Sequence, residues 1–201
     1  MPRPPDLVLF DLGGVLIELS GLSSMSELSG IVDERELWRR WLGCRWVRTF
    51  EAGHCSPDDF AHGVVDDWSL PIHPDEFLEI FASWPTGPLE GAEALVRDTA
   101  DAVPIGCLSN TNELHWDGRV EHWPLIAHFD RRFVSHRMGH VKPDAAAFAW
   151  VAGALDVARD RVLFLDDNEE NAEGARAAGF RAETVGGVNG ARAALVAHGL
   201  F

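Results

Sequence analysis

Polar and charged side chains stand directly after three apolar segments of the chain, and a lysine precedes an expected helix start. They are Asp11, Ser109, Asn110, Lys142, Asp166 and Asp167. Two or three carboxylates that converge repel one another and raise each other's pKa. A hard divalent cation such as Mg²⁺, which prefers oxygen ligands, would compensate their charge, and so would a lysine. These residue types predict a site in which carboxylates, a cation and an ammonium group act together.

The segment around Asp11 indicates where such a site would lie. Apolar residues 7–10 run directly into Asp11, and Gly13 and Gly14 follow. A short apolar run bounded by turn residues is typical of a strand buried on both faces of a parallel sheet. Asp11 would then stand at the carboxyl end of the strand, where open α/β sheets bind ligands. Taken alone, the segment favours an ordinary turn-forming aspartate, and the later segments change that interpretation.

An alternation of strands and helices begins at Pro88. The pattern predicts helices over 89–101, 144–155, 170–178 and the C-terminal end, and strands over 103–109, 132–135, 162–166 and 181–185. Strands that alternate with helices form a parallel sheet covered on both sides. We therefore expect an α/β protein with a Rossmann-like, doubly wound parallel sheet. Because parallel strands end at one edge, the polar groups that follow them are expected to converge.

Residues 18–84 have a different sequence pattern, which predicts amphipathic helices and no convincing strand. Ser56-Pro57 and His73-Pro74 are typical helix starts, in which a capping residue precedes a proline. The segment 85–88, Pro-Thr-Gly-Pro, breaks the pattern. We expect residues 1–17 and 85–201 to form the α/β domain, with 18–84 inserted as a helical domain.

Composition restricts the partners and the compartment. The chain has 201 residues and a formal net charge of −15, which argues against nucleic acid and anionic membranes as partners. No apolar run reaches the length of a membrane span, and residues 1–5 do not read as a secretory signal. Three cysteines without disulfide or metal spacing favour the cytoplasm. We expect a cytoplasmic monomer or homodimer that acts on a small molecule.

The polar segments, taken in order, resemble the four motifs of the haloacid dehalogenase superfamily of hydrolases. They are Phe10-Asp11-Leu12-Gly13-Gly14-Val15-Leu16, Leu108-Ser109-Asn110-Thr111-Asn112, Val141-Lys142-Pro143-Asp144 and Phe164-Leu165-Asp166-Asp167-Asn168. The inserted block resembles the helical cap, of the C1 type, that follows the first motif in this family. Within the superfamily the chain looks most like sugar-phosphate phosphatases typified by bacterial α-D-glucose-1-phosphate phosphatase. It is also similar to the N-terminal phosphatase domain of soluble epoxide hydrolase.

This resemblance implies a Mg²⁺-dependent phosphatase that acts on a small phosphorylated metabolite. The reaction would pass through an aspartyl-phosphate intermediate. The resemblance makes Asp11 the nucleophile and gives Mg²⁺ three protein ligands, the carboxylates of Asp11 and Asp167 and the main-chain carbonyl of Gly13. Asp166 then supports the metal without being its main ligand. In the implied reaction the carboxylate of Asp11 attacks phosphorus in line with the leaving group.

The resemblance also implies which residues bind the phosphoryl group. Ser109 and Asn110 hold phosphate, and Lys142 stabilises both Asp11 and the transferring group. His115, six residues after Ser109, is a candidate acid or phosphate ligand, although a surface-loop histidine is the simpler interpretation. In the inserted block, the segments 45–48 and 51–54 are candidates for selecting the substrate.

Gly13 departs from the pattern of most phosphatases in the superfamily, which carry a second aspartate there as general acid and base. General acid–base catalysis typically raises the rate by about 10²–10⁴. Another group must therefore act as the acid, or the leaving group must depart without much protonation. Sugar 1-phosphates have better leaving groups than ordinary alkyl phosphates. A substrate of that kind would fit the missing acid.

Three other functions stay open at the level of sequence. A metal-independent haloacid dehalogenase would use Asp11 to attack carbon, but Asp166 and Asp167 would repel the carboxylate of its substrate. Dehalogenases of this family also usually have an aromatic residue where Gly13 stands. A catalytically weak protein that binds a phosphorylated metabolite would explain the missing acid. A phosphotransferase would use the same residues with an alcohol in place of water.

Overall fold

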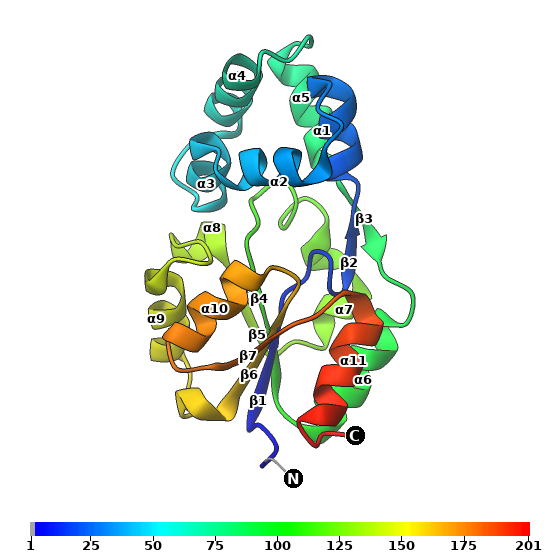
Figure 1. Cartoon of the computed structure of the whole chain (residues 1–201), viewed down its shortest axis with the longest axis vertical. Helices are drawn as coiled ribbons and strands as arrows, with labels where there is room; N and C mark the ends of the chain where they lie inside the picture. Colours follow the sequence, from blue (N-terminus) through cyan, green and yellow to red (C-terminus); the bar gives the residue numbers. More distant parts are fainter. Residues whose placement is uncertain (1–2) are drawn as a thin grey trace.

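Five parallel strands build the centre of the protein, described over residues 3–201 by a computed structural model (Figure 1). Their order is β5-β4-β1-β6-β7, with β1 Leu7–Phe10, β4 Ile105–Ser109, β5 Arg131–Val134, β6 Val162–Asp166 and β7 Arg181–Thr184. All residues of β1, β4 and β6 are buried, as their continuous apolar sequences require in a sheet covered on both faces. The predicted α/β fold with a doubly wound parallel sheet is confirmed.

Helices cover both faces of this sheet. Val8 and Phe10 of β1 pack against one layer, formed by α6 Ala92–Ala102, α7 Pro124–Ala127 and α11 Gly187–Ala197. Leu7 and Leu9 point the other way and pack against α9 Ala145–Ala154 and α10 Glu169–Ala177. Successive residues of a strand face opposite sides, so a four-residue apolar strand supplies both layers at once. The two layers lie on opposite sides of the sheet in Figure 1.

Five helices between residues 21 and 82 form a separate layer beyond the carboxyl ends of the strands (Figure 1). We call them the helical block: α1 Gly21–Ser29, α2 Glu34–Leu42, α3 Arg45–Glu51, α4 Pro57–Trp68 and α5 Pro74–Ala82. The block has its own apolar cluster, in which Phe50 stacks on Phe60 with the ring centroids 4.4 Å apart. The predicted cap at Ser56 is present, since its hydroxyl accepts the N–H of Asp59.

A two-stranded antiparallel ribbon joins the helical block to the α/β core, and it corrects one prediction. Strand β2 Ile17–Leu19 pairs with β3 Pro85–Pro88, where the sequence indicated a helical segment and a break. The ribbon escapes recognition because β2 has only three residues and β3 begins and ends with proline, a residue confined to strand edges. The expected domain limits at 17/18 and 84/85 fall in this ribbon and remain a prediction, and residues 1–2 lie outside the described range.

The segments between strands contain short helices that the sequence pattern did not indicate. These are η1 Val120–His122, η2 Arg159–Arg161 and α8 Ser135–Met138, with η denoting a 3₁₀ helix. Helix α8 begins directly after β5, at a serine assigned to the strand by its sequence. Within residues 3–201, every helix is too short or too polar to cross a lipid bilayer.

Candidate active site

The loop after β1 places Asp11 at the carboxyl end of the central strand. The N–H of Asp11 donates to the carbonyl of Leu165 on β6 at 2.8 Å, and the residue is 8% exposed. Gly14 follows with a φ of 69°, and a Cβ there would lie 2.0 Å from Oδ2 of Asp167. A glycine is therefore needed for two reasons, the left-handed backbone and the close approach of the second carboxylate.

Three carboxylates meet at this edge of the sheet. Asp11, Asp166 and Asp167 each offer an oxygen, and these oxygens lie within 4.8 Å of one another. Asp166 is fully buried, and its oxygens accept from the N–H of Asn168 at 2.9 Å and from the amide of Asn171 at 3.0 Å. Asp167 is exposed and follows β6, and Asp11 follows the neighbouring strand β1 with 8% of its surface exposed, so these two carboxylates are the ones open to a ligand.

Lys142 compensates the two buried carboxylates. Its Nζ lies 2.9 Å from Oδ1 of Asp11 and 2.6 Å from Oδ2 of Asp166, and it donates to the carbonyl of Leu108 at 2.9 Å. Three acceptors thus match the three donors of an ammonium group. Lys142 is also the single lysine of a chain with 16 arginines, and it is 2% exposed. A compact ammonium fits this position, whereas a planar guanidinium would not.

The charges of this group act on one another strongly because Asp11, Lys142 and Asp166 are buried. Burial raises the pKa of Asp11 above its ordinary value, Lys142 opposes this shift, and the charges of Asp166 and Asp167 add to it. Burial lowers the pKa of Lys142, but the charges of Asp11 and Asp166 outweigh it and raise the pKa above its usual range. The lysine therefore stays charged, and added positive charge near Asp11 would favour its carboxylate form.

Ser109 and Asn110 lie at the end of the neighbouring strand β4, as the sequence predicts. The amide of Asn110 donates to the carbonyl of Lys142 at 2.9 Å, and the N–H of Lys142 donates to Oδ1 of Asn110 at 2.8 Å. This reciprocal pair fixes the lysine segment against β4 and occupies the side chain of Asn110. A phosphoryl group could then meet Asn110 through its main-chain N–H. Among residues 3–201, the one hydrogen-bond contact of the Ser109 hydroxyl is a long one of 3.5 Å, to the carbonyl of Asn110.

His115 occupies a position that differs from both interpretations made from the sequence, an acid or phosphate ligand and a surface-loop histidine. Its Nε2 lies 2.7 Å from the carbonyl of Phe81, its Nδ1 lies 3.2 Å from the amide of Asn112, and its ring stacks on Phe81 at 4.2 Å. Burial lowers the pKa of His115 to about 4, so the ring is neutral at pH 7. With its proton donated to a carbonyl, His115 has none to give a leaving group. We assign it a structural role between the core and α5.

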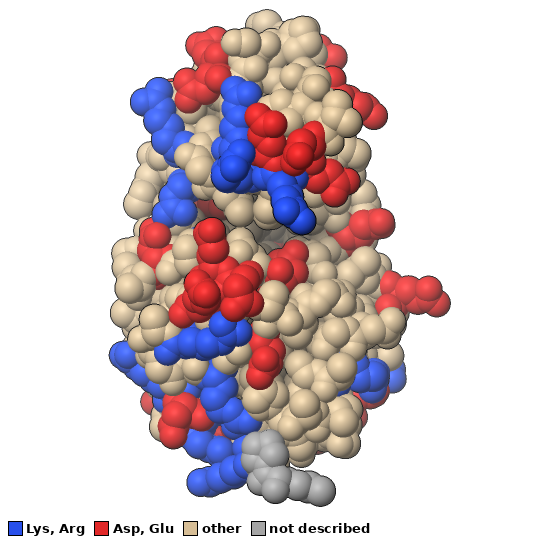
Figure 2. All heavy atoms as spheres, viewed as in Figure 1, with Lys and Arg blue, Asp and Glu red and all other residues tan. Residues whose placement is uncertain are grey.

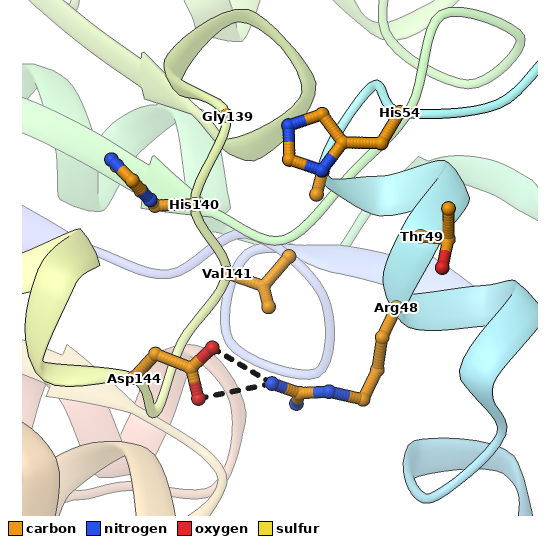
Figure 3. A pocket seen from close by; sticks show the side chains of 8 residues that line it. Arg48, Thr49, His54, Gly139, His140, Val141 and Asp144 are labelled. Carbon is orange, nitrogen blue, oxygen red and sulfur yellow. Dashed lines mark hydrogen bonds and ion pairs between the residues drawn. The ribbon is translucent and has the colours of Figure 1, made fainter.

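A cavity of about 210 Å³ lies where α3 meets the segment that leads to Lys142 (Figure 3). Arg48, Thr49 and His54 line one side, and the other side is formed by Gly139, His140, Val141 and Asp144. Nη2 of Arg48 reaches both carboxylate oxygens of Asp144, at 2.9 and 2.8 Å. Figure 2 shows a hollow between the helical block and the core, with basic side chains above it and acidic ones below.

Two contacts in this region had no signal in the sequence. The Arg48–Asp144 pair joins residues 96 positions apart, and Asn171 binds Asp166 from the first turns of α10. Arg48 and Asn171 belong to no recognisable motif, although Asp144 and Asp166 do, and the tertiary fold alone brings each pair together. The sequence named residues 45–48 only as one segment of candidates.

A family description of haloacid dehalogenase-like hydrolases matches residues 5–179 of the chain. The chain belongs to this family. An enzyme of the family from Bacteroides thetaiotaomicron, solved in complex with magnesium, superposes on this hydrolase with a TM-score of 0.73 at 20% identity, covering 92% of this chain and 94% of that one. The L-2-haloacid dehalogenase of Xanthobacter autotrophicus, with chloropropionic acid covalently bound, gives 0.66 at 18% identity, with coverages of 90% and 77%. At such identities these likenesses show the fold.

A curated relative is closer in sequence but much longer. The drimenol cyclase DrtB of Aspergillus calidoustus is 37% identical over 188 residues. That alignment covers 87% of this hydrolase and 33% of the cyclase, so the chain spans about a third of the relative's length. The likeness therefore does not extend to the rest of the cyclase, which this chain does not match.

Proposed function

We propose that this hydrolase is a Mg²⁺-dependent phosphatase that acts on small phosphorylated metabolites and forms an aspartyl phosphate on Asp11. The arrangement of the three carboxylates carries the proposal. Protein donors bind both oxygens of Asp166, whereas Asp11 and Asp167 retain carboxylate oxygens that a cation can share. The Bacteroides enzyme with the same fold, also solved with magnesium and inorganic phosphate, supports the choice of magnesium and a phosphate ester.

The residues fit a hard divalent cation. Asp11 and Asp167 would supply carboxylate oxygens, and within residues 3–201 no main-chain N–H donates to the carbonyl oxygen of Gly13, which is free to be a third ligand. All three are oxygen donors, which is the set that Mg²⁺ prefers. When bound, Mg²⁺ would supply positive charge for the phosphoryl oxygens and hold them in line with the nucleophile.

In the proposed reaction, a carboxylate oxygen of Asp11 bonds to phosphorus while the bond to the leaving-group oxygen breaks. Lys142 holds Asp11 at 2.9 Å and supplies a fixed positive charge beside the transferring group. Ser109 and the main-chain N–H of Asn110 would bind phosphoryl oxygens at the end of β4. Water then attacks the aspartyl phosphate, the phosphorus–oxygen bond to Asp11 breaks, and inorganic phosphate leaves.

The helical block would act as the cap of this site. It lies beyond the carboxyl ends of the strands, and Asp11 beneath it is 8% exposed (Figure 1). Such a cover excludes water from a charged reaction and selects substrates by shape. Because no carboxylate stands at position 13, we propose sugar 1-phosphates, with their better leaving groups, as the first substrates to test. This choice follows the resemblance to α-D-glucose-1-phosphate phosphatase.

A haloacid dehalogenase is the second candidate, because the Xanthobacter dehalogenase shares the fold. Against it stands Asp167, whose oxygen lies within 4.8 Å of Asp11, where the carboxylate of a haloacid would have to enter. Like charges at such a distance are costly when no cation compensates them.

A paired assay separates these functions. We expect phosphate release from glucose 1-phosphate with Mg²⁺ and no chloride release from 2-chloropropionate with EDTA. Glucose added as acceptor with a phosphate donor tests transfer, for which sugar phosphate would appear in place of inorganic phosphate. Chloride release without metal would overturn the proposal, and binding of sugar phosphate without turnover would favour a binding protein.

A further inference from the structure

The proposed reaction leaves one proton without a donor. An alkyl leaving group departs as an alkoxide unless an acid protonates it, and position 13 has no side chain to do so. A Cβ at Gly13 would lie 2.8 Å from Cδ1 of Leu19, the far end of an exposed side chain that can move aside, so packing does not by itself explain the glycine. His115 donates its proton to a carbonyl and stays neutral. The donor must therefore come from another element.

Helix α3 presents one side to the core next to Lys142. Arg48 and Glu51 are three residues apart and so lie on the same side of the helix. Arg48 pairs with Asp144, two residues after Lys142 (Figure 3). Just beyond the helix, Gly53 touches the core so closely that a Cβ would lie 2.4 Å from the carbonyl oxygen of His136.

Glu51 lies between these two contact points, at the last position of α3. Val47 and Phe50 of the same helix are buried in the apolar cluster of the helical block, and Glu51 lies on the helix surface between Val47 and Arg48, the residue that pairs with the core. Glu51 is half-buried. The positive charges of Lys142 and Arg48 act on its carboxyl group, which is consistent with its place on α3 next to the segment that carries Lys142.

The environment of Glu51 suits proton transfer. No side-chain hydrogen bond within residues 3–201 stabilises its carboxylate. Burial raises the pKa of Glu51 to about 7, although Lys142 and Arg48 oppose the shift. A carboxyl group with such a pKa holds a proton part of the time at neutral pH and can give it up or take it back.

We propose that Glu51, from the helical block, is the acid–base residue of this hydrolase; this role rests on the proposed phosphatase function. Protonated Glu51 gives its proton to the leaving-group oxygen as Asp11 bonds to phosphorus and the phosphorus–oxygen bond of the substrate breaks. The Glu51 carboxylate then takes a proton from the water that attacks the aspartyl phosphate. Phosphate leaves, Asp11 is free again, and Glu51 is protonated for the next turnover.

The test uses two aromatic phosphates of similar size that differ in leaving group. p-Nitrophenyl phosphate needs no acid, because nitrophenolate is a good leaving group, whereas benzyl phosphate releases an alkoxide. For Glu51→Gln we expect kcat/KM to fall about 10²-fold or more with benzyl phosphate and about threefold or less with p-nitrophenyl phosphate. In the wild type, kcat/KM for benzyl phosphate should fall above pH about 7, because Glu51 loses its proton there. In Glu51→Gln this fall should be absent.

Two further variants make the result decisive. Glu79→Gln removes an exposed carboxyl group from α5 and should leave both substrates unaffected. Glu51→Asp, which withdraws the carboxyl by one methylene, should lose benzyl phosphate activity only in part. Equal losses with both substrates, or no loss with either, would overturn the role of Glu51 while the wild type stays active. A wild type that releases no phosphate from p-nitrophenyl phosphate with Mg²⁺ would overturn the phosphatase itself.

Discussion

At the scale of single residues, the site depends on one lysine in a chain that otherwise uses arginine. Lys142 sits between Asp11 and Asp166 with its three donors satisfied, so its charge is what allows two carboxylates to be buried. A buried ion pair that loses one partner leaves an uncompensated charge, which is far more costly than the pair is stabilising.

Lys142→Met should therefore lower the free energy of unfolding by about 3–5 kcal/mol and abolish turnover. Urea unfolding followed by circular dichroism measures the change. Arg97→Met, on the exposed side of α6, serves as the control and should change stability by less than about 0.5 kcal/mol. A Lys142→Met protein as stable as the wild type would contradict the assigned charge balance.

Gly14 offers a second test, because the chain contains a matched control. Gly14 and Gly30 have φ values of 69° and 71°, but a Cβ at Gly30 would meet nothing within 4 Å, whereas at Gly14 it would collide with Asp167. Replacing either residue with alanine should cost about 1 kcal/mol of stability through backbone strain. Only Gly14→Ala should weaken Mg²⁺ binding, measured by calorimetry. Equal Mg²⁺ affinity in the two variants would speak against Asp167 as a ligand.

At the scale of elements, apolar runs with turn residues after them located the strands that carry Asp11, Ser109 and Asp166. The convergence of those groups follows from parallel topology, so most of the candidate site could be predicted. The β2–β3 ribbon could not, because three residues and a proline-bounded segment give no periodicity. The sequence named His115 as a candidate acid and included Glu51 in the candidate segment 51–54, but the roles assigned here could not be predicted, since they depend on contacts between the helical block and the core that lie far apart in sequence.

His115 connects the loop after β4 to α5, and it makes this junction sensitive to acid. The pKa of His115 is about 4 in the folded protein against 6.5 for a free histidine. Between pH 4 and pH 6.5, the unfolded state therefore binds a proton that the folded state does not. The contribution to stability is fully present above pH 6.5 and is lost as the pH falls toward 4. It amounts to at most roughly 3 kcal/mol.

Urea unfolding at pH 4 to 7 tests this. In His115→Gln the slope of stability against pH should be shallower than in the wild type over this range. His122→Gln, at an exposed position, should keep the wild-type slope. Identical slopes for all three proteins would show that His115 is accessible to protons in the folded state.

At the scale of the whole molecule, the helical block meets the core through the ribbon, through His115 against α5, through the close approach of Gly53 to His136, and through the ion pair between Arg48 and Asp144. The two side chains are 38% and 52% exposed, so water screens the pair and its contribution is about 0–1 kcal/mol. A pair of this strength can add to the closure of the block over the site without locking it there.

Arg48→Gln should accordingly raise KM by up to about fivefold and leave kcat almost unchanged. The difference in KM from the wild type should shrink at high salt. Arg45→Gln breaks an ion pair with Asp67 inside the helical block and should leave KM unchanged. Steady-state kinetics at two ionic strengths measures both. A salt-independent loss of kcat in Arg48→Gln would instead place Arg48 in the chemical step.

The central claim is that Asp11 and Mg²⁺ together hydrolyse a phosphate ester, and phosphate release from p-nitrophenyl phosphate tests it most directly. The assay compares wild type with Mg²⁺, wild type with EDTA, and Asp11→Asn with Mg²⁺. We predict release in the first case and none above background in the other two. Release that persists in EDTA or in Asp11→Asn would contradict the account.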